Sequence, residues 1–160
     1  MGFLRETGMP VPHRFISTAE TALNLRLQKL FASEAVEIDR VRDIVSEIND
    51  WDIAVDKLAL EFIVRRRVEA AMAALLENPE DGQSISEVLH LAESLAALPI
   101  GVNLWQAQNM YWDMLKSLAT NRQSGGGEEY ECSGRSEAIR TLGQLLYFNA
   151  GAALAARGDI

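Results

Sequence analysis

Glu87 and His90 have the spacing of a metal-binding motif. In a Glu-x-x-His pair on a helix, the carboxylate and the imidazole lie one turn apart on one face, as in di-iron helical bundles. Such a centre needs a second pair, and the only other histidine, His13, stands in a proline-flanked segment without a suitable partner. Ser84, three residues before Glu87, predicts a helix-capping box instead. With no His-Glu-x-x-His motif and no cysteine pair for zinc, the sequence predicts no metal site.

Three consecutive arginines, Arg65, Arg66 and Arg67, could in principle bind an anion, because guanidinium groups bind carboxylate and phosphate in a bidentate manner. On a helix, however, consecutive side chains point about 100° apart and do not converge on one ligand. Glu61 and Glu69 stand four residues before and after Arg65, which is the spacing of helical ion pairs. The pattern therefore predicts a solvated row of ion pairs.

The parts of other catalytic and cofactor sites are not found together in this sequence. The single cysteine, Cys132, lies in a glycine-rich segment, and no Gly-x-Ser-x-Gly motif supplies a nucleophilic serine. Gly125, Gly126 and Gly127 are not followed by the Gly-Lys-Ser/Thr of a phosphate-binding loop. Among 23 acidic residues, spacing alone selects no catalytic pair. We assign no catalytic residue and no cofactor.

The segment from Leu98 to Trp112 is the most unusual, since it combines two tryptophans, a tyrosine and four side-chain amides. Projected on a helix, one arc has the composition of a core: Leu104, Gln108, Tyr111, Leu115 and Leu118. Trp105, Asn109 and Trp112 lie on the flank of that arc. One interpretation is packing between helices, with local acceptors for the indole N–H groups. The other is a docking or ligand surface for a second domain or a sugar.

Two of the four amides have a simpler structural explanation. Asn103 and Gln106 have the spacing of an N-cap residue and its return partner at the start of a helix. Trp105, Asn109 and Trp112 are then the residues whose exposure decides between the two interpretations.

Composition narrows the class of partner. The chain has 160 residues, the size of one domain, and a formal net charge of −8 from 15 basic and 23 acidic residues. Such a surface repels phosphate backbones, so nucleic acid is not an expected partner.

No apolar run approaches the roughly 18 to 20 residues that span a bilayer, so no membrane partner is expected. The start of the chain lacks the apolar core of a signal peptide, and the lone cysteine fits a reducing compartment; we expect a cytoplasmic protein.

Helical periodicity predicts an all-α fold, a helical bundle of about five to six helices. The expected helices begin with stripes over Ile16–Leu30 and Ile38–Ile48, continue with the longest over Ile53–Glu77, and end with helices opening at Ser84, at Asn103 and after Gly134. Residues 1–121 form the predicted bundle core, residues 122–134 a glycine-rich flexible linker or loop, and residues 135–160 a last helix. That helix docks on its own bundle or on a partner, and Gly143 and Gly151 would allow another helix to approach closely.

Several segments resemble one known helical region. These are Leu4-Arg-Glu-Thr-Gly-Met-Pro-Val-Pro-His13, Thr21-Ala-Leu-Asn-Leu-Arg-Leu27, Arg65-Arg-Arg67, Leu98-Pro-Ile-Gly-Val-Asn-Leu-Trp-Gln-Ala-Gln-Asn109 and Leu142-Gly-Gln-Leu-Leu146. The region is the C-terminal helical part, itself without an assigned function, of bacterial α-amylase or α-mannosidase-like glycosidases related to glycoside hydrolase family 57. The resemblance extends from Phe3 to about Leu146, and its most specific part is Asn103-Leu-Trp-Gln-Ala-Gln-Asn109.

The resemblance implies a non-catalytic accessory domain that packs against an upstream, carbohydrate-active (β/α) barrel. In those proteins the catalytic carboxylates belong to the barrel, so no catalytic residue carries over to this chain. As an isolated chain it is then not an enzyme, although it would be part of one. The alternative is a stand-alone interaction module that forms a homodimer through its last helix.

Overall fold

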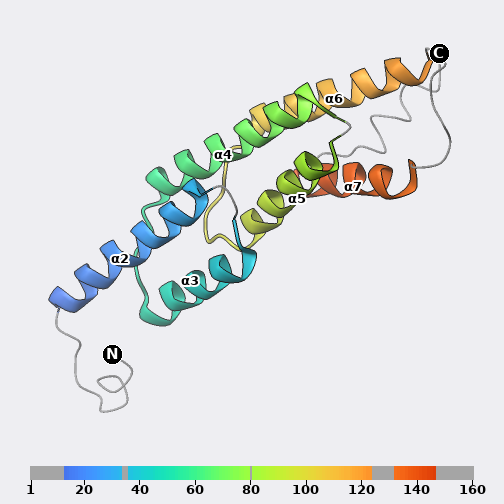
Figure 1. The fold of residues 1–160 in the computed structure, drawn as a ribbon. Coiled ribbons are helices and arrows are strands. Elements are labelled where there is room, and N and C mark those ends of the chain that lie inside the picture. Colours follow the sequence, from blue (N-terminus) through green and yellow to red (C-terminus); the bar gives the residue numbers. More distant parts are fainter. Residues whose placement is uncertain (1–12, 34–35, 80, 124–131, 147–160) are drawn as a thin grey trace.

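The computed structural model describes residues 13–33, 36–79, 81–123 and 132–146. These residues form helices without any strand, as Figure 1 shows: α2 (His13–Ala32), α3 (Ile38–Trp51), α4 (Lys57–Glu77), α5 (Gly82–Ala96), α6 (Trp105–Gln123) and α7 (Cys132–Leu145). The predicted all-α bundle is therefore confirmed. None of these helices combines the length and the apolarity needed to cross a membrane.

The longest helix, α4, runs along the long axis of an elongated molecule (Figure 1). It packs against α2, α5 and α6, and its buried side chains follow one stripe along its whole length: Leu60, Val64, Val68, Ala71, Met72 and Leu75. The carboxylate of Asp56 caps its first turn by accepting a 3.1 Å hydrogen bond from the backbone N–H of Ala59. Because its first half contributes side chains to one hydrophobic core and its second half to another, α4 joins the two cores.

The first core lies between α2, α3 and the first half of α4. Its fully buried members include Leu27, Phe31, Val41 and Val64. The predicted stripe over Ile16–Leu30 is wrong at its start, because Ile16 is 37% exposed. The N-terminal end of α2 extends beyond the other described helices (Figure 1), so none of those helices covers the apolar residues there.

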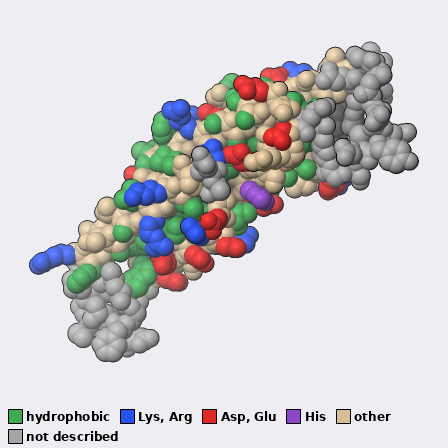
Figure 2. Space-filling model, viewed as in Figure 1, with side chains coloured by type: hydrophobic (Ala, Val, Ile, Leu, Met, Phe, Trp, Pro, Cys, Tyr) green, Lys and Arg blue, Asp and Glu red, His purple; other side chains and the backbone are tan. Residues whose placement is uncertain are grey.

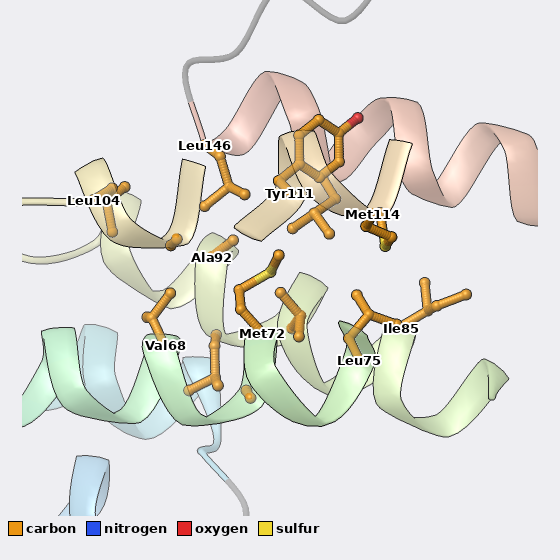
Figure 3. Close-up of a cluster of buried hydrophobic side chains, with 14 of the residues drawn as sticks. Val68, Met72, Leu75, Ile85, Ala92, Leu104, Tyr111, Met114 and Leu146 are labelled. Atoms are coloured by element: carbon orange, nitrogen blue, oxygen red, sulfur yellow. The ribbon is translucent and has the colours of Figure 1, made fainter. Parts of the chain in front are cut away.

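The second core lies between the second half of α4, α5, α6 and α7. Figure 3 shows its side chains converging from these helices: Val68, Met72, Leu75, Ile85, Ala92, Leu104, Tyr111, Met114 and Leu146. Partly buried Val36, Leu95 and Val102 pack against both cores, so the two are continuous.

The predicted start of the third helix at Ile53 is wrong. α3 ends in a Schellman motif, in which Asp52 has a left-handed φ of 52° and the N–H of Ile53 donates to the carbonyl of Ile48 at 3.0 Å. Ile53 is buried in the first core, as the apolar residue of that motif. α4 begins four residues later, at Lys57.

The predicted capping box of Ser84 and Glu87 is also wrong. α5 begins at Gly82, and the carboxylate of Asp81 caps it by accepting from the N–H of Gln83 at 3.2 Å and from that of Ser84 at 3.0 Å. The Ser84 hydroxyl donates to the same carboxylate at 2.5 Å. These hydrogen bonds, led by that from the hydroxyl, lower the pKa of Asp81. Glu87 is thereby left to pair with another helix.

The last described helix, α7, packs on α5 and buries Leu142 and Leu146 in the second core. Gly143 is buried as well. α6 continues to Gln123 and α7 begins at Cys132, so both helices extend into the predicted 122–134 linker. Residues 124–131 and 147–160, Gly151 among them, lie outside the described part. Within that part, α7 docks on its own bundle.

Candidate docking surface

Trp105 is the first residue of α6, and its side chain is 70% exposed. The backbone beneath it is fixed by Asn103, whose side-chain oxygen accepts a 3.0 Å hydrogen bond from the N–H of Trp105. The N–H of Asn103 donates to Oε1 of Glu61 on α4 at 3.4 Å. The predicted capping role of Asn103 is thus found, but Glu61 takes the place predicted for Gln106. The indole of Trp105 is therefore exposed, while the backbone that carries it is fixed by these two hydrogen bonds.

Asn109 and Trp112 continue the same flank of α6 at the fourth and seventh positions after Trp105. Asn109 is exposed, whereas Trp112 is half-buried and packs against the second core. The ammonium of Lys116 lies 5.8 Å from the centroid of the Trp112 ring, within the range of a cation–π interaction, and also pairs with Asp113 at 2.5 Å. Trp105 and Asn109 therefore lie on the surface, whereas Trp112 is partly packed in the second core.

The neighbouring arc of α6 is core, as its spacing predicts. Leu104, Tyr111 and Leu115 are buried. Gln108 donates through Nε2 to the carbonyl of Leu146 at 2.7 Å, and the Tyr111 hydroxyl donates to the carbonyl of Ile139 at 2.9 Å. Burial raises the pKa of Tyr111 to about 12. The packing interpretation thus holds for this arc, whereas Trp105 and Asn109 on the flank are exposed.

The arginine row is divided among separate partners. Arg65 pairs with Glu61 at 3.2 Å on its own helix, while Arg67 reaches across to Glu87 on α5 at 2.6 Å. Arg66 lies over the ring of Phe62, with 5.8 Å between its guanidinium carbon and the ring centroid. The ion-pair interpretation holds for Arg65 with the predicted Glu61, but the cross-helix pair of Arg67 was not predicted.

Sequence reasoning also missed a second exposed apolar face, on α4. Leu58 is 85% exposed and Phe62 is 50% exposed. Figure 2 shows hydrophobic side chains at the surface near the start of this helix, with Lys and Arg side chains close by. The charge pattern of residues 65–67 predicts ion pairs, but it does not predict that the apolar side chains of Leu58 and Phe62 on the same helix are exposed.

Glu87 and His90, the pair with metal-ligand spacing, both line a cleft beside α5. In the part of the chain that the structure describes, no group of three or more His, Cys, Asp or Glu side chains is placed to hold a metal ion. The Glu87 carboxylate instead pairs with Arg67.

Comparison with family models, curated proteins and solved structures gave no match.

Proposed function

We propose that this chain is a non-catalytic helical accessory domain of a glycosidase-like protein, and that it packs against the catalytic barrel through Trp105, Asn109 and Trp112. The observation that carries the proposal is the 70% exposure of the Trp105 side chain at the start of α6. Leaving so much of an indole in water forgoes the favourable free energy of burying it, and tryptophan is enriched among the residues that dominate the energetics of protein interfaces.

The surroundings of Trp105 suit a protein interface. Its backbone is held by Asn103 and, through Asn103, by Glu61, so little backbone entropy is lost when the indole is covered. Asn109 adds an exposed amide, and Lys116 adds a cation beside the half-buried Trp112. An aromatic anchor with polar groups around it has the composition of a binding hot spot and its rim.

The glycosidase part of the proposal rests on the resemblance of Asn103-Leu-Trp-Gln-Ala-Gln-Asn109 to the C-terminal region of those enzymes. In that family the catalytic carboxylates belong to the barrel. The role proposed for this chain is to cover and support part of that barrel, without contributing a catalytic group.

Calorimetric titration tests the docking role. The partner is the barrel of a bacterial α-amylase or α-mannosidase-like glycosidase from which its own C-terminal helical region has been removed. Trp105→Ala should weaken binding about 30-fold, the loss that corresponds to a hot-spot residue of about 2 kcal/mol. Leu58→Ala is the matched control, since it removes another largely exposed apolar side chain, on α4, and should leave the affinity within about twofold.

Equal affinities of the wild-type and Trp105→Ala chains, or no binding of the wild-type chain, would contradict the docking role. A hydrolysis assay tests the other half of the proposal. The purified chain should not cleave α-linked oligosaccharides, and cleavage that disappears on mutation of one of its own carboxylates would show that it is an enzyme.

A further inference from the structure

A cleft of about 250 Å³ lies beside α5, and Trp105, Asn109 and Trp112 are not among the described residues that line it. Its lining combines polar side chains with two apolar ones: Val36, Arg67, Gln83, Ser86, Glu87, His90 and Leu91. Figure 2 shows a histidine side chain at the surface over α5, with acidic side chains beside it. Pockets for drug-sized ligands start at about 300 Å³, so this cleft has room for a ligand of about one ring.

The polar groups of the cleft are positioned by regular structure. Gln83, Ser86 and His90 stand at relative positions 0, 3 and 7 on α5, so they share one helix face. Arg67 on α4 is held by its 2.6 Å ion pair with Glu87, in which the two side chains are only 25% and 40% exposed. A carboxamide, a hydroxyl, an imidazole and an ion pair therefore surround one small space.

Among the lining residues that the structure describes, the opposite charges of Arg67 and Glu87 balance, and this balance favours an uncharged ligand. The guanidinium of Arg67 and the carboxylate of Glu87 cancel, and they already satisfy each other's charge. An anion would approach the Glu87 carboxylate, and a cation would approach the Arg67 guanidinium, so each would meet a like charge. An uncharged hydroxyl avoids both costs, because it can donate to a carboxylate and accept from a guanidinium.

We propose that the cleft between Arg67, Glu87 and His90 binds an uncharged ligand with two adjacent hydroxyl groups, such as a single sugar ring or another cyclic polyol. One hydroxyl donates to the Glu87 carboxylate while its neighbour accepts from Arg67, so the vicinal pair bridges the ion pair. Gln83, Ser86 and His90 supply further donors and acceptors. Val36 and Leu91 contact the C–H face of the ring. This binding site is independent of the docking role of Trp105.

Nuclear magnetic resonance titration of the full chain tests the proposal, with the ring signals of His90 and the side-chain amide of Gln83 as local reporters. The probes are trans-1,2-cyclohexanediol, trans-1,4-cyclohexanediol, glucose and inorganic phosphate. We expect saturable shifts with the 1,2-diol and glucose, and binding at least tenfold weaker for the 1,4-diol. No saturable shift, equal binding of the two diol isomers, or tighter binding of phosphate would overturn the proposal.

Two variants assign the binding to this lining. Glu87→Gln removes the carboxylate with little change of shape and should weaken diol binding about tenfold. Because that variant also removes the ion pair between α4 and α5, Ser86→Ala provides a milder change at an exposed position of the cleft and should weaken binding severalfold with an unchanged Tm. Ser46→Ala, on the exposed side of α3, is the control and should bind as the wild type does. Unchanged binding by both cleft variants would overturn the proposal.

Discussion

The hydroxyl of Tyr111 on α6 donates a 2.9 Å hydrogen bond to the backbone carbonyl of Ile139 on α7. Tyr111 is one of the largest fully buried side chains in the described part of the chain, and its ring packs in the second core while its hydroxyl reaches the neighbouring helix (Figure 3). Three residues before it, Gln108 makes the parallel contact with the carbonyl of Leu146. One side of α6 thus holds α7 in place.

Removing that hydroxyl should loosen the last helix. Tyr111→Phe keeps the ring but leaves the carbonyl of Ile139 without this donor, so we expect the free energy of unfolding to fall by about 1 to 2 kcal/mol. Urea denaturation measures it. Ser117→Ala, at an exposed position of α6, is the control and should change stability by less than about 0.5 kcal/mol. Equal stability of Tyr111→Phe and wild type would show that the hydrogen bond contributes nothing.

The raised pKa of Tyr111 predicts that the free energy of unfolding falls at alkaline pH. Its pKa is raised from 10.0 to about 12 in the folded chain, so between these values the folded state holds a proton that the unfolded state has released. The free energy of unfolding then falls as pH rises, by up to about 1.4 kcal/mol per pH unit from this group. Tyr111→Phe has no phenol to titrate, so it lacks this contribution to the pH dependence of stability. The stability advantage of the wild type should shrink between pH 9.5 and 11, and a constant advantage would contradict the assignment.

The cross-helix pair of Arg67 and Glu87 should be stronger than ion pairs on the open surface. A double-mutant cycle with Arg67→Met and Glu87→Gln should give a coupling energy of roughly 0.5 to 1 kcal/mol, because these side chains are partly buried. The pair of Arg40 and Glu37, 66% and 58% exposed, is the comparison and should give roughly 0 to 0.5 kcal/mol. Equal coupling energies for the two pairs would contradict the ranking.

Asp81 should make the stability of α5 sensitive to acid. Its carboxylate is stabilised by hydrogen bonds from Ser84 and Gln83, which place its pKa below the ordinary 3.8. A carboxyl group with a lowered pKa stabilises the fold above its unfolded pKa, and the contribution is lost as pH falls through the folded pKa. Asp81→Asn keeps a capping oxygen without the titration. The wild type should have the higher Tm at pH 6, and this difference should disappear towards pH 2; a difference independent of pH would contradict the capping role.

Much of the fold follows from local pattern. Helical spacing in the sequence predicts every described helix, because each one buries a stripe that repeats with the period of the helix. The prediction from helical spacing fails at Ile53, because this apolar residue belongs to the motif that ends α3 and does not begin α4. It also fails at Ile16, where the stripe continues although no other described helix covers this residue.

The candidate surfaces were less predictable. Helical projection separates the flank of Trp105 from the arc of Tyr111, since that division depends on one helix only. The pairing of Arg67 with Glu87 depends on how α4 lies against α5, and these residues are 20 positions apart. Spacing within one helix has no information on such a contact. The exposure of Phe62 likewise depends on which side of α4 the other helices leave uncovered.

The indole N–H signals of the three tryptophans offer the most direct test of the proposed docking role. Trp105 and Trp112 lie on the flank of α6, whereas Trp51 packs against the first core at the end of α3 and serves as an internal reference. Addition of the glycosidase barrel to isotope-labelled chain should shift or broaden the signals of Trp105 and Trp112 and leave that of Trp51 unchanged. Perturbation of Trp51 alone, equal perturbation of all three signals, or no perturbation at all would contradict the account.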